Sequence, residues 1–125
     1  MVFMEDSLPV LTIREITPLE LAARMQSEEK LVLLDVREPY EVARSKIADP
    51  RVVYAPMSEL ARKQTQALPP AVEDKAAPLV VFCHVGQRSA QVTYWLQDLG
   101  WENVVSLAGG IDLYAHLVNP AIGFY

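Results

Sequence analysis

The 125-residue sequence has only one cysteine, Cys83, and two histidines, His84 and His116. A single cysteine excludes an intramolecular disulfide framework, so nothing in the sequence implies an oxidising compartment. One cysteine and two scattered histidines do not make a structural zinc site either. We therefore expect a fold without disulfides and without a metal centre.

The sequence also lacks an excess of basic residues and a long apolar run. With 11 basic and 16 acidic residues the net charge is −5, which offers no basic surface for nucleic acid or anionic lipid. No apolar run approaches the length needed to cross a bilayer. Residues 1–10 include Glu5 and Asp6 and lack the basic and apolar regions of a signal peptide. We therefore expect a cytoplasmic protein without nucleic-acid or membrane partners, in which an anionic substrate would need a local positive group.

What remains is an ordinary globular composition, with 51% hydrophobic and 22% charged residues. The length fits one domain, residues 1–125, with a single core. Short apolar runs rich in branched residues are typical of strands, and they cover residues 31–36, 52–55, 79–83 and 103–107. Helical patterns lie between these runs, so we expect an α/β fold with a mainly parallel sheet.

Several expected helices carry boundary signals. Thr17 is suited to be the N-cap of one helix, and Ser58 is suited to open another over residues 59–68. The clearest helical pattern runs over residues 89–99, and the glycine after it suits a C-cap. The proline-rich stretch 67–78 is interpreted as a surface connection.

Functional groups in such folds gather beyond the carboxyl ends of the strands, which here means after Asp35 and after Phe82. Cys83 follows Phe82, Gly86 is suited to a sharp turn, and Arg88 stands at the mouth of the next helix. A strand–loop–helix of this kind can direct several backbone N–H groups at one point, and the helix N-terminus and the arginine add positive charge. These groups would favour the nucleophilic thiolate and would hold the negative charge of a persulfide.

Three segments resemble the motifs of rhodanese-family sulfurtransferases, and they occur in the family's order. Residues 83–89 (CHVGQRS) resemble the active-site loop, residues 34–41 (LDVREPYE) the motif after the second strand, and residues 103–111 (NVVSLAGGI) the closing strand and glycine turn. The resemblance spans about residues 12–117 and implies a rhodanese-like three-layer α/β/α fold with a mainly parallel central sheet. The chain departs from the family pattern at residues 45–50 and at Tyr114, where a tryptophan is common.

The resemblance implies a sulfurtransferase that works in two steps and needs no metal or organic cofactor. The Cys83 thiolate would attack the outer sulfur of thiosulfate or of a persulfide donor and would itself become a persulfide. The sulfur would then pass to a thiol, to cyanide or to a protein acceptor.

Within this interpretation Cys83 is the catalytic residue and the rest of its loop binds the substrate. The substrate-binding residues would be His84, Val85, Gly86, Gln87, Arg88 and Ser89. Asp35 and Arg37 are interpreted as a buried ion pair that supports the strand ends beside the loop. His84 is not expected to act as a general base, since a stabilised thiolate needs none.

Two other functions stay open on the sequence. A rhodanese-like domain can be a catalytically silent binding module, although such modules typically lose the cysteine that this chain retains. Related phosphatases and arsenate reductases use a loop with five residues between cysteine and arginine, whereas four stand between Cys83 and Arg88. The shorter loop favours a sulfur atom over a tetrahedral oxyanion, and there is no second cysteine to resolve an oxidised thiol.

Overall fold

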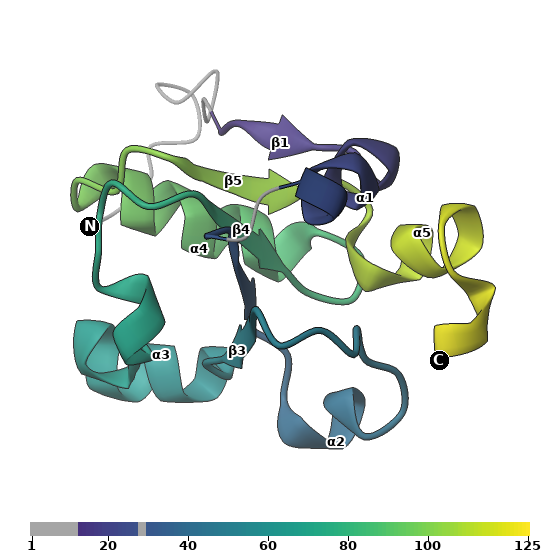
Figure 1. Ribbon diagram of the computed structural model, residues 1–125. Helices are drawn as coiled ribbons and strands as arrows, with labels where there is room; N and C mark the ends of the chain where they lie inside the picture. The colour runs from purple at the N-terminus through teal and green to yellow at the C-terminus, as the bar shows by residue number, and fades with distance from the viewer. Residues whose placement is uncertain (1–12, 28–29) are drawn as a thin grey trace, which may run out of the picture.

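A parallel β-sheet with helices on both faces forms the body of the protein in the computed structural model, which describes residues 13–27 and 30–125 (Figure 1). In this part of the chain the sheet has five strands in the order β1-β5-β4-β2-β3, and neighbouring strands run parallel. The strands are β1 (Glu15–Ile16), β2 (Val32–Asp35), β3 (Val52–Tyr54), β4 (Leu79–Phe82) and β5 (Val104–Leu107). The helices are α1 (Pro18–Ser27), α2 (Pro39–Val42), α3 (Met57–Lys63), α4 (Gln87–Asp98) and α5 (Gly110–Leu117), with 3₁₀ turns at Gln64–Ala67, Pro70–Val72 and Pro120–Ile122. The expected three-layer α/β class with a parallel sheet is confirmed.

The two faces of the sheet bury separate apolar clusters. α1 and α5 cover one face, where Leu21 and Ile111 pack in a cluster with Phe82 (Figure 1). α3 and α4 cover the other face, where Leu96 packs in the cluster that contains Cys83. Phe82 and Cys83 are successive residues of an extended chain and therefore face opposite layers. The sulfur thus lies on the α4 side of the sheet.

Two of the expected helix boundaries are present. Thr17 Oγ1 accepts the Glu20 N–H at 3.1 Å, and the Glu20 carboxylate accepts the Thr17 N–H at 2.9 Å, so the two residues form a capping box at α1. Gly100 follows α4 with a φ of 107°, a left-handed conformation that suits glycine. α4 itself starts at Gln87, two residues before the predicted position.

The region between β3 and β4 differs from the prediction. Ser58 does not open a helix: its N–H and its hydroxyl donate to the Glu38 carboxylate at 3.0 and 2.7 Å, and α3 starts one residue earlier. The helix is also shorter than expected, because Gln64 takes a φ of 57° and the chain continues as a 3₁₀ turn. The stretch 67–78 is more than a surface connection, since Val72 within it is 2% exposed and belongs to the core.

The expectation that residues 1–10 are not a signal peptide lies outside the described residues. Within the described ranges, no helix is both long enough and apolar enough to span a membrane. The same ranges contain no group of three or more histidine, cysteine or acidic side chains that is placed to hold a metal ion.

The start of α5 packs directly against the loop after β4. The Ile111 N–H donates to the Cys83 carbonyl at 2.9 Å. The next N–H, of Asp112, donates to the His84 carbonyl at 3.0 Å. Gly110 permits this approach, because it has a φ of 62° and any Cβ at this position would collide with the His84 carbonyl. The turn between β5 and α5 therefore fixes where the loop begins.

The replacement Gly110→Ala is expected to lower the free energy of unfolding by about 3 kcal/mol, because the strain of a positive φ adds to a backbone collision. Gly100→Ala is a matched control. Its φ is also positive, but the added Cβ would meet only the Lys75 side chain, at 3.7 Å, so a loss of about 1 kcal/mol is expected. Urea denaturation measures both values. Equal losses would show that the close approach at Gly110 does not constrain the fold.

Candidate active site

Cys83 has no exposed surface, and the loop that follows it curls around its sulfur. The Gly86 N–H donates to Sγ at 3.1 Å, and the Ser89 N–H donates to it at 3.3 Å. Gly86 has a φ of 106°, which lets the chain turn sharply into α4. The N–H group of the residue before α4 and one N–H group of its first turn thus point at one sulfur atom, an arrangement that stabilises a thiolate.

A pair of buried hydroxyls lies beside the sulfur. The Ser89 hydroxyl is 3.5 Å from Cys83 Sγ, 3.2 Å from the Gly86 carbonyl oxygen and 2.8 Å from the Ser106 hydroxyl. Ser89 and Ser106 are both fully buried, so their contact links the loop to β5 inside the core. Ser106 was not among the expected site residues, although a serine within the apolar run 103–107 was a signal for a polar contact.

The guanidinium of Arg88 binds the carboxylate of Glu41 through two hydrogen bonds. Nη1 and Nη2 lie 2.7 and 2.8 Å from the two carboxylate oxygens. These bonds lower the pKa of Glu41 to about 2, against the opposing effect of burial. The same bonds raise the pKa of Arg88, and the negative charge of a Cys83 thiolate adds to the increase. The charge of Arg88 therefore interacts with the sulfur but is compensated mainly by Glu41.

Asp35 and Arg37 form a second ion pair, which is fully buried beside the loop. Arg37 Nε donates to Asp35 Oδ1 at 3.0 Å, and Nη2 donates to Oδ2 at 2.8 Å. The remaining nitrogen, Nη1, donates to the Glu41 carbonyl at 3.3 Å and to the Tyr125 hydroxyl at 3.0 Å. Asp35 is paired with Phe82 across β2 and β4, so this ion pair lies next to the strand end that carries the sulfur.

Tyr125 connects the two ion pairs to the loop. Its hydroxyl accepts the hydrogen bond from Arg37 and donates to Glu41 Oε1 at 3.2 Å. Its ring stacks on the imidazole of His84, with centroids 4.0 Å apart and an angle of 17° between the planes. No sequence pattern indicates a role for Tyr125. Glu41 lies within the motif of residues 34–41, but the sequence predicts no role for it.

The remaining loop side chains differ in their surroundings. His84 Nε2 is buried and has no hydrogen-bond partner among the described residues. Val85 is 50% exposed and Gln87 is exposed, so both side chains lie at the rim of the loop. The loop thus brings two backbone N–H groups to the sulfur, directs one ring toward Tyr125 and leaves two side chains in contact with solvent.

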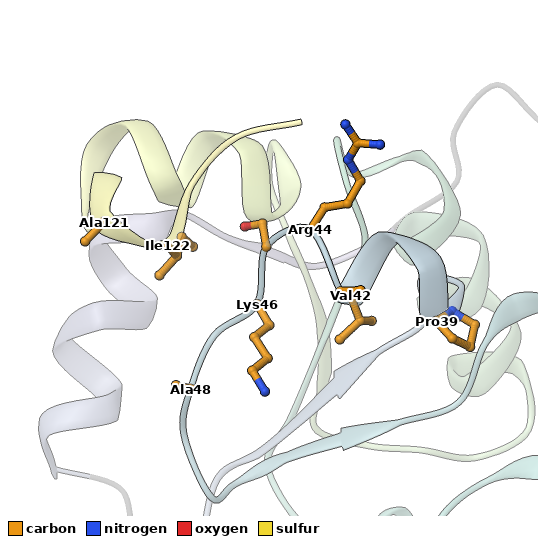
Figure 2. Close-up of a pocket in the computed structure, with 9 residues that line it drawn as sticks. Pro39, Val42, Arg44, Lys46, Ala48, Ala121 and Ile122 are labelled. Atoms are coloured by element: carbon orange, nitrogen blue, oxygen red, sulfur yellow. The ribbon is translucent and has the colours of Figure 1, made fainter.

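A pocket of about 620 Å³ lies near this region, but the sulfur is not part of its lining (Figure 2). It lies between the segment after α2 and the C-terminal 3₁₀ turn, and it is lined by Pro39, Val42, Ala43, Arg44, Ser45, Lys46, Ala48, Ala121 and Ile122. Figure 2 shows Arg44 and Lys46 extending in different directions. The two cations therefore do not converge on a common anion, and the candidate active site stays with the loop around Cys83.

Comparison with known proteins places these features in a family. A family model described as Rhodanese-like domain matches residues 17–117. A sulfurtransferase of Allochromatium vinosum is 30% identical over 110 residues, which cover 88% of this chain and 95% of that protein. The chloroplastic Rhodanese-like/PpiC domain-containing protein 12 of Arabidopsis thaliana is 33% identical over 119 residues, which cover 90% of this chain but only 38% of that protein. The crystal structure of a rhodanese-related protein from Thermoplasma volcanium matches with a TM-score of 0.69 and 31% identity, over 86% of this chain and 95% of that one.

The replacement Asp35→Ala is expected to lower the free energy of unfolding by about 4 kcal/mol, because it leaves the fully buried guanidinium of Arg37 without a counter-charge. Asp49→Ala is a matched control. Asp49 and Arg51 have the same spacing and the same 2.8 Å N–O distance, but their side chains are 16% and 19% exposed, so about 2 kcal/mol is expected. Chemical denaturation gives both values, and a smaller loss for Asp35→Ala than for Asp49→Ala would contradict the expectation.

The pH dependence of stability tests the contact between Glu41 and Arg88. Because the pKa of Glu41 is about 2 in the folded protein and 4.5 ordinarily, its ionisation stabilises the fold above pH 4.5. This contribution is lost as the pH falls from 4.5 towards 2. Glu41→Gln should cost about 2 kcal/mol at neutral pH and should show a shallower loss of stability in that pH window.

Glu59→Gln is the control for this pH measurement, since it removes an exposed pair with Arg62 and should cost less than about 0.5 kcal/mol. Urea denaturation at several pH values compares the three proteins. An equally steep acid loss in the parent protein and in Glu41→Gln would show that Arg88 does not hold the Glu41 carboxylate.

Proposed function

This chain belongs to the rhodanese-like domain family, and we propose that it is a sulfurtransferase that carries sulfur as a persulfide on Cys83. The observation that carries the proposal is the convergence of the Gly86 and Ser89 N–H groups on Sγ, at 3.1 and 3.3 Å. In this proposal these donors first stabilise the thiolate and then the persulfide, and the loop residues 84–89 form the substrate site. The related sulfurtransferase supports the same reaction class.

The proposed cycle has two displacement steps. The Cys83 thiolate attacks the outer sulfur of thiosulfate or of a persulfide, and the bond between that sulfur and the rest of the donor breaks. The bonding electrons leave with the donor, as sulfite or as a thiolate. An acceptor thiolate or cyanide, or a cysteine of an acceptor protein, then attacks the outer sulfur on Cys83 and restores the thiolate. The chemistry requires neither a metal nor an organic cofactor.

The surrounding ion pairs have positioning roles in this proposal. Asp35 and Arg37 support the strand ends, and Glu41 with Tyr125 holds Arg88 at the start of α4. A thiol that must stay reduced between turnovers is suited to the reducing environment of the cytoplasm, where we place the protein. We take residues 1–125 as one functional domain.

Intact-protein mass after incubation with sulfur donors tests the proposal. The protein should gain one sulfur atom from thiosulfate or from a persulfide, because the loop encloses Cys83 and the chain has no second cysteine to expel the sulfur as a disulfide. Cyanide or a small thiol should return the protein to its starting mass. Cys83→Ser should gain no sulfur, because a hydroxyl is a far weaker nucleophile than a thiolate.

Two outcomes would contradict the sulfurtransferase. An unchanged mass with every donor, together with hydrolysis of an aryl phosphate, would favour a phosphatase. An unchanged mass without any activity would favour a catalytically silent binding module.

A further inference from the structure

The charges around Cys83 are already paired, and this determines which sulfur donor suits the site. Arg37 binds Asp35 through two nitrogens, and Arg88 binds Glu41 through two nitrogens. Within the loop of residues 83–89, Arg88 is the one permanently charged cation. Both ion pairs are therefore neutral as units, and the Cys83 thiolate gives the site one net negative charge.

Thiosulfate would bring two more negative charges into this site. When the thiolate attacks its outer sulfur, the S–S bond to the sulfonate breaks and the electron pair leaves with sulfite as a dianion, so the reacting groups carry three negative charges throughout. The anion of an organic persulfide brings one charge and leaves as a thiolate, so its reacting groups carry two. Because the sulfur of Cys83 has no contact with solvent, each uncompensated charge is poorly screened there.

Three exposed side chains with apolar surface lie at the end of the sheet that carries the site. Val85 follows β4 and is 50% exposed, Tyr54 ends β3 and is 43% exposed, and Tyr40 in α2 follows β2 and is 71% exposed. These strands run parallel, so their carboxyl ends meet at the edge of the sheet that carries Cys83. An organic group attached to the donor sulfur can cover such side chains, whereas a sulfonate gains nothing from them.

We infer that the sulfur donor is the persulfide of an organic thiol, on a small molecule or on a protein, and that thiosulfate is a poor donor. The charges of Arg37 and Arg88 are already compensated by Asp35 and Glu41, so a sulfonate meets no excess positive charge, and the exposed Val85, Tyr54 and Tyr40 side chains suit an organic group. This inference rests on the proposed function, because it concerns the first step of the same cycle.

The first experiment measures how fast Cys83 gains a sulfur atom, by intact mass, from thiosulfate and from the persulfide of 2-mercaptoethanol, whose organic group is uncharged, at neutral pH. Each rate constant is divided by that of free cysteine with the same donor, which removes the intrinsic reactivity of the donor. The normalised rate constant is expected to be at least about tenfold larger for the organic persulfide. A persulfide carried on serum albumin forms a third arm: a rate above that of the 2-mercaptoethanol persulfide indicates a protein-borne donor, and a lower rate indicates a small one.

The second experiment adds a positive charge to the loop of residues 83–89. Val85→Lys should raise the rate constant for thiosulfate about tenfold at low salt relative to Val85→Gln, and high salt should abolish the increase. Leu99→Lys is the matched control, since it adds the same charge beyond the other end of α4, about 18 Å along the helix, and should leave the thiosulfate rate unchanged.

Four outcomes would overturn the inference. Normalised rate constants that are equal for thiosulfate and the organic persulfides would show that the charge balance does not select the donor. If Val85→Lys reacts no faster with thiosulfate than Val85→Gln does, the lack of a free positive charge does not limit the rate of sulfur transfer from thiosulfate. Failure to accept sulfur from any donor would overturn the inference together with the proposed function. A protein that accepts sulfur but prefers thiosulfate would overturn the inference alone.

Discussion

The position of one sulfur atom depends on a loop that is held from two sides. On one side, the first N–H groups of α5 bind the carbonyls of Cys83 and His84. On the other side, the N–H groups of Gly86 and Ser89 bind the sulfur itself. Each hydrogen bond is worth only about 1 kcal/mol in net stability, but together they leave the loop little freedom. A rigid set of donors needs no rearrangement when charge develops on the sulfur, which is the condition for effective electrostatic stabilisation.

The second constraint is the chain of polar contacts that runs from Asp35 through Arg37, Tyr125 and Glu41 to Arg88. It joins the end of β2, the helix α2, the C-terminal residues and the start of α4. Because every member has a charged or hydrogen-bonding neighbour, a change at one end alters the surroundings of the next. Arg88 is therefore part of a structural network, and its charge is compensated by Glu41.

The sequence predicted the parts of the structure that follow from short-range patterns. The four main strands, the capping box at Thr17 and the placement of Cys83 after a buried strand needed only apolar runs and local cap signals. The early end of α3 depends on a positive φ at Gln64, which no residue pattern indicates. The contacts of Arg88 and Tyr125 were equally hidden, because their partners lie 47 and 84 residues away in the chain. Local rules cannot specify which distant side chain pairs with a given charge.

The buried ion pair of Asp35 and Arg37 is better explained by the geometry that it imposes than by a contribution to the free energy of unfolding. Transferring Asp35 and Arg37 from water into the core costs several kcal/mol per ion, and apolar residues of similar volume often stabilise a core as well or better. An apolar pair, however, has no directional preference. Arg37 meets Asp35, the Glu41 carbonyl and the Tyr125 hydroxyl with three nitrogens in one plane, so these directional contacts constrain how the three segments lie relative to one another. The ion pair therefore defines the relative position of these segments, and the position of Glu41 in turn determines where the charge of Arg88 lies.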